Sequence, residues 1–442
     1  MAALTVLAGA VLLLWPALAN SYPLAFIDTV SYLLHTLSWT HPWDKTAAYG
    51  PLMLAAHWRV SLWGVVAAQA ALLSWLLWRV QGVVRGEGDG TRHLLLMAIL
   101  AVASTAPWFA SLLMPDILAP VVVLALFLMG WDERAGPGMR AAYGAIAAAA
   151  IAAHLSHLGI AGALVAAAVL ARRRVARLVQ VAAPLGLAVL FLLAANLLAF
   201  GKPVLSAHGA LFLLARLQAD GPAAETLRRH CPQRGWVLCA HADLLPMESN
   251  RFLWSGDSPI LRDRGGAPRP GNGLSLVGEA SEIVATTLRE QPLETAQAMI
   301  ANTLRQALRI GVGDTLDPSD LRGGVADVVA DLLGAAERAR FQSGAQLRGD
   351  LVAPSDWVHA RALVAALALI VAWVATGRWR RKPAATAFLA CALIGILANA
   401  FMTGALSGPH DRYGARIAWL IVAAAAVIWL QAGDRRSCEL NR

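Results

Sequence analysis

The residues best suited to chemistry gather in one polar stretch near the start of the chain. Residues 20–59 separate two apolar segments and read NSYPLAFIDTVSYLLHTLSWTHPWDKTAAYGPLMLAAHWR. They carry Asp28 shortly after the first apolar segment, and then His41, Asp44 and Arg59. Ionisable side chains at the end of a membrane bundle are costly, so they are functional candidates by default. Asp28 is the first choice for a catalytic residue, because one carboxylate can serve as a general base.

Other candidates lie beside later apolar segments. Asp116, in LLMPDILAP, is a second candidate catalytic carboxylate. Basic side chains near the membrane surface suit the stabilisation of an anionic leaving group. The candidate substrate-binding residues are therefore Arg59, Lys202, Arg412 and Arg416, together with His41, Asp44, His410, Asp411 and Trp254. Trp254 is included because a tryptophan ring can line a sugar or lipid groove.

Each candidate also has a structural alternative, and the sequence leaves both open. Asp28 and Asp116 precede predicted helices and could cap them. Asp411 could form a structural ion pair with Arg412 or Arg416. Arg59 and Lys202 could contact lipid headgroups. His41 and Asp44 could stabilise a turn.

The composition indicates that these residues belong to a membrane protein. The chain has 442 residues, of which 58% are hydrophobic and only 15% charged, with 16 tryptophans. That balance lies outside the range of soluble globular proteins and inside that of polytopic membrane proteins. The net charge of +9 does not indicate nucleic-acid binding, because residues 201–361 hold 17 Lys/Arg against 18 Asp/Glu. The basic surplus lies in short loops and tails, where it reflects orientation in the membrane.

The pattern of apolar segments predicts an all-α polytopic membrane protein with about ten transmembrane helices. The predicted spans are 3–19, 60–78, 94–113, 117–131, 141–154, 158–171, 180–200, 359–376, 384–405 and 416–431. We expect three parts: 1–200 with the first seven spans, 201–358 as a mainly helical domain outside the membrane, and 359–442 with the last three spans and a basic tail. In the middle part, periodicity predicts helices over 280–311, broken at Pro292, and over 323–341.

The distribution of Lys and Arg predicts that both termini lie inside. The segments 79–93, 131–140, 172–178, 377–383 and 432–442 hold 16 Lys/Arg, whereas 20–59, 114–116, 155–157 and 406–416 hold four. Short loops rich in Lys and Arg stay in the cytoplasm. The first span ends in PALANSYP, which resembles a signal-peptide cleavage site, but it lacks the basic residues that precede such a site. We therefore expect an uncleaved anchor.

Two cysteines in the predicted outer domain are candidates for a disulfide. Cys231 and Cys239 lie eight residues apart in RRHCPQRGWVLCAH. An oxidising compartment favours a bond between them. The alternative is a zinc site that uses His230 and His241, but the cysteine spacing is not the usual one for zinc.

The arrangement of these parts resembles the GT-C superfamily of membrane glycosyltransferases. The similarity rests on an N-in polytopic bundle, a long first outer loop with Asp28 in SYPLAFIDTVSY, and a large outer domain after the seventh span. The resemblance implies transfer of a sugar from a polyprenyl-phosphate carrier to an extracytoplasmic glycan, lipid or protein, in a bacterial inner membrane. It also implies that Asp28 acts as a base or lies beside a divalent cation. The loop has no D-x-D pair, so no metal ligands are assigned.

Other functions stay open at this stage. A transporter or flippase of a lipid-linked glycan should show charged or broken segments at mid-membrane and repeated halves. Here the polar residues lie at one end of the predicted bundle and no repeat is visible. A non-catalytic envelope-assembly protein would work through residues 201–356. An acyltransferase would use His154 or His157, which are one turn apart and too few to make a metal site. The expected partners are a lipid-linked sugar donor and membrane lipid.

Overall fold

Helices build the chain throughout the computed structural model, which describes residues 1–171, 174–319, 321–351 and 356–430. The described residues contain no strand, and only two isolated bridges pair extended segments, Leu24 with Leu112 and Arg262 with Pro268. The prediction of an all-α fold is thus confirmed. The predicted basic tail from 432, and residues 172–173 of the basic segment 172–178, lie outside the described residues.

The first part of the chain contains ten α-helices and one 3-10 turn up to residue 170. They are α1 (Ala2–Leu13), α2 (Trp15–Asn20), α3 (Thr29–Ser38), α4 (Tyr49–His57), α5 (Trp63–Arg85), α6 (Gly90–Ala103), α7 (Ala106–Ala110), η1 (Pro115–Ile117), α8 (Leu118–Trp131), α9 (Pro137–Ala152) and α10 (Leu155–Leu170). The predicted span 3–19 is divided between α1 and α2. Pro16 accounts for the break, because proline lacks an N–H and clashes with the preceding turn.

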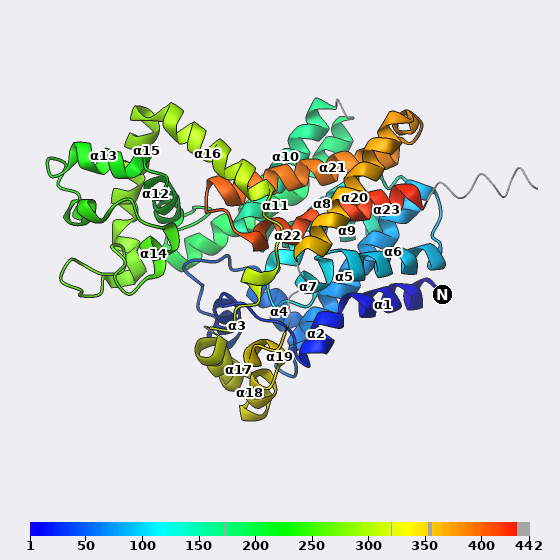
Figure 1. Ribbon diagram of the computed structural model, residues 1–442, viewed down its shortest axis with the longest axis horizontal. Coiled ribbons are helices and arrows are strands. Elements are labelled where there is room, and N and C mark those ends of the chain that lie inside the picture. Colours follow the sequence, from blue (N-terminus) through cyan, green and yellow to red (C-terminus); the bar gives the residue numbers. More distant parts are fainter. Residues whose placement is uncertain (172–173, 320, 352–355, 431–442) are drawn as a thin grey trace, which may run out of the picture. The chain divides into compact units, whose positions relative to one another are not determined.

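The remaining helices follow in the order that Figure 1 labels them. They are α11 (Val175–Phe200), α12 (Gly209–Ala219), α13 (Pro222–His230), η2 (Val237–Leu244), α14 (Ser249–Trp254), η3 (Pro270–Leu276), α15 (Val277–Glu290), α16 (Pro292–Ala307), η4 (Gly313–Thr315), η5 (Leu321–Val325), α17 (Ala326–Leu333), α18 (Ala335–Gln342), α19 (Ala345–Arg348), α20 (Asp356–Ala375), η6 (Arg378–Arg381), α21 (Pro383–Ala400), η7 (Phe401–Ala405), α22 (Asp411–Ala418) and α23 (Leu420–Trp429). The predicted break at Pro292 separates α15 from α16.

Five helical segments are long and apolar enough to cross a membrane, judged by length and composition. They are Trp63–Arg85, Val175–Phe200, Trp357–Ala375, Pro383–Ala405 and Asp411–Trp429. These five segments indicate a membrane protein. The other predicted spans correspond to helices of fewer than 18 residues, shorter than the roughly 20 residues that a bilayer core needs. The count of ten spans and the orientation therefore stay predictions.

Two compact units divide the described chain. The first comprises Met1–Phe191, Arg309–Asn399 and the segment from Asp411. Its centre is α8, whose side chains are buried almost all round, as expected for a helix that is apolar on every face. Within this unit the Tyr22 hydroxyl donates to Glu337 at 2.9 Å, and the side chain of Gln346 both donates to and accepts from the backbone of Ala25. Residues 309–351 therefore belong to the unit of the N-terminal helices, whereas we expected a single domain over 201–358. Their place outside the membrane stays a prediction.

The second unit comprises Leu192–Leu308 and Ala400–His410. It contains helices α12 to α16, the last turns of α11, and η7. Its core is formed by buried apolar residues that include Leu214, Leu227, Phe252 and Ile283. Cys231 and Cys239 are joined by a disulfide, with their Cα atoms 5.4 Å apart.

Candidate functional site

Five charged side chains form an alternating row in the first unit. Arg412 lies between two carboxylates, with Nη2 3.7 Å from Oδ2 of Asp28 and Nη1 3.9 Å from Oδ2 of Asp116. At one end of the row, Nζ of Lys45 lies 3.0 Å from Oδ1 of Asp28. At the other end, Nη1 of Arg416 lies 3.3 Å from Oδ1 of Asp116. We call these five residues the acid–base cluster.

Short helical segments position the cluster. Arg412 and Arg416 lie four residues apart on α22, so both project from one face of that helix. Asp28 directly precedes α3, but its side chain makes no capping hydrogen bond there. Asp116 lies in η1, just before α8, and does not cap α8 either. Neither Asp28 nor Asp116 therefore caps a helix through its side chain, and both carboxylates face cations instead.

The loops that meet at the cluster are those predicted to lie on the outer side. Asp28 and Lys45 come from segment 20–59, Asp116 from 114–116, and both arginines from 406–416. The fourth outer segment, 155–157, contributes the hydroxyl of Ser156, which accepts a hydrogen bond from Arg416 at 2.8 Å. Four loops far apart in sequence thus converge on one site.

Arg416 is held rigidly. Its Nη2 also donates to Oδ1 of Asn399 at 2.7 Å, and its Nε donates to the same oxygen at 3.1 Å. The side chain is 1% exposed. Every guanidinium nitrogen of Arg416 donates a hydrogen bond to Asn399, Ser156 or Asp116. Arg416 therefore fixes the position of Asp116.

Arg412 is also buried, but its two carboxylate partners lie farther away than the partner of Arg416. Its side chain is 8% exposed, and its guanidinium lies 4.0 Å from the ring centre of Phe26 and 5.1 Å from that of Tyr413. Both of its distances to the carboxylates exceed hydrogen-bond range. Among the described residues, Nη1 of Arg412 finds no hydrogen-bond acceptor. A buried guanidinium with an unused donor is suited to receive an anion.

The two carboxylates differ in their access to solvent. The side chain of Asp28 is 27% exposed, whereas that of Asp116 is 3% exposed. Burial by itself raises the pKa of Asp28, but the charges of Lys45 and Arg412 outweigh it and hold the pKa below its ordinary value. Burial conversely lowers the pKa of Lys45, and the charges of Asp28 and Asp44 more than reverse this effect. Asp28 and Lys45 are therefore both ionised at neutral pH.

Four other predicted residues of the first unit are not members of the five-residue row. Asp44 reaches it through Lys45, which it contacts at 2.8 Å. Arg59 is exposed, and its guanidinium donates to the carbonyl of Thr36. The ring of His41 stacks against that of His35, with 6.3 Å between ring centres. Asp411 begins α22 and has no ion pair within the described part of the chain.

Three predicted residues belong to the second unit. Lys202 is exposed just after α11. The backbone of His410 exchanges two hydrogen bonds with the side chain of Gln306. Trp254 ends α14 and contacts Phe212, with 6.0 Å between ring centres.

The sequence interpretation missed three residues that hold the cluster together. Lys45 follows Asp44 directly and is the only lysine of the first outer loop. Asn399 is a polar residue inside an apolar span, which is a signal for a functional or structural role. Ser156 lies between His154 and His157, and its hydroxyl also bonds Nδ1 of His154 at 2.8 Å.

The donor set of the cluster does not suit a divalent cation. Each oxygen of Asp28 and Asp116 already faces an ammonium or guanidinium group. A metal ion would have to displace those cations, which the same carboxylates neutralise. In addition, the described residues contain no group of three or more His, Cys, Asp or Glu placed to hold a metal ion.

An apolar groove begins three residues after Lys45. It has a volume of about 430 Å³ and lies between α4, α9 and α11. Its walls consist almost entirely of alanine and other apolar residues: Ala48, Pro51, Leu52, Ala148, Ala149, Ala152, Leu187, Ala188 and Phe191. The hydroxyl of Thr46, which follows Lys45, donates to the carbonyl of Ala153 at 2.9 Å, so the loop of Lys45 is fastened to the end of α9.

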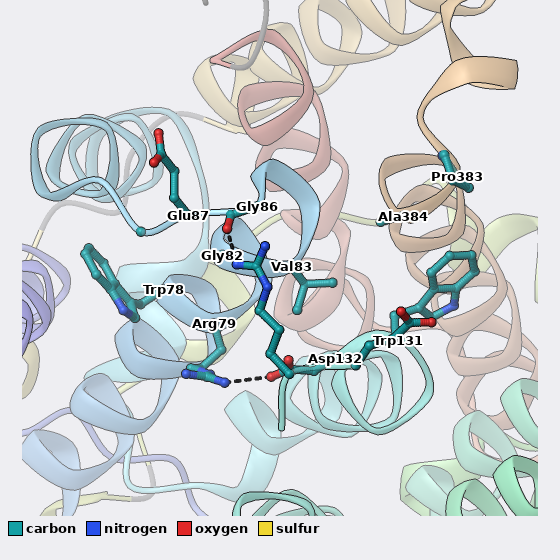
Figure 2. A pocket seen from close by; sticks show the side chains of 13 residues that line it. Trp78, Arg79, Gly82, Val83, Gly86, Glu87, Trp131, Asp132, Pro383 and Ala384 are labelled. Carbon is teal, nitrogen blue, oxygen red and sulfur yellow. Dashed lines mark hydrogen bonds and ion pairs between the residues drawn. The ribbon is translucent and has the colours of Figure 1, made fainter. Parts of the chain in front are cut away.

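A second cavity, of about 550 Å³, is formed by segments predicted to lie on the inner side. Figure 2 shows it between the end of α5, the loop after α8 and the start of α21. In this view Arg79 points toward Asp132, to which it donates at 2.7 Å. The hydroxyl of Tyr143 donates to the same carboxylate at 2.8 Å. Arg134 donates to the carbonyl of Gly86. These contacts join α5 and the loop after it to the loop after α8 and to α9, and none of the residues belongs to the acid–base cluster.

Comparison with known proteins provides no relative. The chain matches no protein-family model, no characterised protein and no solved structure. Any assignment of function therefore depends on the geometry of the site.

Proposed function

We propose that the protein is a membrane glycosyltransferase of the GT-C kind. In this proposal it transfers a sugar from a polyprenyl-phosphate donor to a glycan, lipid or protein acceptor outside the cytoplasm of a bacterial cell. The observation that carries the proposal is the position of Arg412, a buried guanidinium with an unused donor between Asp28 and Asp116.

The phosphate of the donor would bind at Arg412. The cluster together with Asp44 holds three positive and three negative charges, so it has no net charge of its own. A phosphate would therefore compete with the carboxylates for cations. Arg412 is the cation most open to this competition, because its contacts of 3.7 and 3.9 Å are ion pairs without hydrogen bonds. Arg416 is fully bonded and stays in place.

Asp28 would act as the base. It is the more exposed of the two carboxylates, so an acceptor hydroxyl can reach it. The acceptor oxygen forms a bond to C1 of the sugar while the bond from C1 to the phosphate oxygen breaks. The hydroxyl proton passes to Asp28, and the electron pair of the broken bond stays on polyprenyl phosphate. When Arg412 and Lys45 pair with the phosphate, they stabilise the carboxylate of Asp28 less. The pKa of Asp28 then rises, which makes it a better base.

Asp116 would position Arg412 and would not touch the substrate, because it is almost fully buried and paired with Arg416. The lipid chain of the donor would lie in the apolar groove of α4, α9 and α11, which begins close to Lys45. The apolar groove begins three residues after Lys45, a member of the same cluster as Arg412. A carrier that combines a phosphate with a long lipid tail matches both the anion site and the groove.

Binding of polyprenyl phosphate tests the proposal without knowledge of the sugar. The protein is placed in lipid nanodiscs and titrated with undecaprenyl phosphate, and bound lipid is measured by native mass spectrometry. We expect Arg412→Lys, which keeps the charge but loses the planar fork, to weaken binding about tenfold, or ~1.4 kcal/mol. The control is Arg338→Gln, which removes an exposed arginine of α18. Equal affinity of wild type and Arg412→Lys would contradict the phosphate site.

The catalytic role of Asp28 is tested separately. Asp28→Asn should still bind undecaprenyl phosphate but should lose transfer from a panel of polyprenyl-phosphate sugars. Retained turnover in this variant would exclude Asp28 as the base, while leaving the phosphate site intact.

A further inference from the structure

Helix α16 of the second unit has its polar side buried and its apolar side exposed. Thr295, Asn302 and Gln306 are 2%, 0% and 0% exposed. On the other side of the helix, large apolar side chains face outward at spacings of seven, four and four residues: Leu293 at 73%, Ile300 at 61%, Leu304 at 63% and Leu308 at 83% exposed. These spacings place all four on one helical face. We call this face the apolar stripe.

The orientation of α16 is fixed by hydrogen bonds on its buried side. The amide of Asn302 donates to Asp220 at 2.7 Å. The amide of Gln306 donates to the carbonyl of His410 at 2.8 Å and accepts from the His410 N–H at 2.9 Å. A helix that rolled over to bury its leucines would leave these buried groups without partners, which is costly. The exposure of the stripe is therefore specified by the sequence.

The surroundings of α16 connect it to the membrane. It packs against η7, which is the last part of the candidate span Pro383–Ala405. The backbone of Gly404 in η7 comes so close to the carbonyl of Asn302 that a side chain at this position would collide with it. The same unit also contains the last turns of α11, where Leu198 is 88% exposed. The unit thus holds the ends of two candidate spans, and α16 lies directly against one of them.

The remaining edge of α16 is polar. Glu294 and Arg305 line an open cavity of about 610 Å³ that they share with Asp220 and Arg228. The helix therefore has an apolar stripe next to an edge with charged groups. An amphipathic helix of this kind lies in the plane of a membrane interface, with its apolar side in the acyl chains.

We propose that α16 is an interfacial helix and that its apolar stripe contacts the lipid of the leaflet in which α11 and α21 end. The lipid bilayer is the occupant that the structure favours, because the helix packs against η7, the end of the candidate membrane span Pro383–Ala405. This role is independent of the chemistry at the acid–base cluster.

Spin labels at single cysteines test the proposal on the full-length protein in nanodiscs. The background keeps the disulfide and replaces Cys391 and Cys438 by serine. The labelled variants are Ile300→Cys and Leu304→Cys on the stripe, and Glu294→Cys on the polar edge of the same helix serves as the matched control. We expect the ratio of collision rates with oxygen and with a water-soluble nickel complex to be several-fold higher at 300 and 304 than at 294.

Two outcomes would overturn the proposal. Equal access of the nickel complex to all three labels would place the stripe in water. Protection of labels 300 and 304 from both reagents, with magnetic coupling between labels on different molecules, would assign the stripe to contact between two copies of the chain. The control label at 294 reports in each case that the helix is folded and accessible.

Discussion

The guanidinium of Arg416 lies 3.3 Å from the carboxylate of Asp116, although 300 residues separate the two in the chain. This pair fixes the start of α8 to α22, which begins the last candidate span. Because Asp116 also faces Arg412, the pair connects the hydrogen-bonded Arg416 to the arginine whose carboxylate partners are farther away. The stability of the protein and the chemistry proposed for it therefore depend on the same carboxylate.

Breaking this pair should destabilise the protein strongly. Asp116→Asn leaves Arg416 and Arg412 buried without their shared counter-charge, and such a change costs about 3–5 kcal/mol. The double variant Asp116→Asn with Arg416→Gln should recover part of that loss, because it removes both charges of the pair. Thermal unfolding in detergent measures both. Arg338→Gln, which breaks an exposed pair with Asp327, should cost only about 0–1 kcal/mol. A loss at Asp116 no larger than that of this control would contradict the prediction.

The pair of Asp28 and Lys45 predicts how stability depends on pH. The pKa of Asp28 is lowered from an ordinary value of 3.8, so its contribution is present above that value and is lost as pH falls through the folded pKa. The pKa of Lys45 is raised from 10.5, so its contribution is present below 10.5 and is lost as pH rises through the folded pKa.

Wild-type protein should therefore show a plateau of unfolding temperature between these two values. Asp28→Asn should lower the plateau and should reduce the fall of stability in acid, because the group that is protonated there has been removed. Unfolding midpoints recorded across the pH range check this. An unchanged acid limb in Asp28→Asn would show that other groups dominate it.

The disulfide should stabilise the second unit. It closes a loop with a sequence separation of eight residues, and the chain-entropy model gives about 2.5 kcal/mol for a loop of that size. Replacing Cys231 and Cys239 by serine should therefore speed hydrogen exchange in α13 and η2. Cys391→Ser is the control, because Cys391 is a half-buried cysteine of α21 in the first unit and lies outside the disulfide. Unchanged exchange in the double variant would mean that the Glu279 carboxylate, which accepts from the backbone N–H groups of Val237 and Leu238, suffices to hold the loop.

The orientation of the chain can be tested at two exposed positions. Lys202→Cys in the second unit should react in intact cells with a maleimide that does not cross membranes. Arg134→Cys, at the cavity of Figure 2, should react only after the membrane is permeabilised. Its loop is one of the basic segments, which are predicted to face the cytoplasm. The background lacks Cys391 and Cys438. The reverse pattern of labelling would mean that the second unit faces the cytoplasm.

Local patterns of the sequence predicted the helices well. Within the described residues, every predicted span overlaps one helix or two consecutive helices, and the proline at position 292 divides α15 from α16 as expected. Apolar runs and proline act on their own neighbours in the chain, so a single sequence reveals them. The boundary of the second unit was less predictable. Residues 309–351 pack with the N-terminal helices through contacts such as Tyr22 with Glu337, which no local pattern indicates.

The sequence by itself determined the all-α class, the membrane character and the charged residues beside the apolar segments, because composition and periodicity are properties of neighbouring residues. Asp28, Asp116, Arg412 and Arg416 could be selected as candidates because charged groups next to a membrane are costly. Only the tertiary structure decided that these four meet, that Lys45 completes the row, and that Arg59 donates to the carbonyl of Thr36 instead. It also decided that Lys202 and Trp254 belong to the other compact unit. An ion pair across 300 residues depends on how helices pack, and packing is set by the whole chain at once.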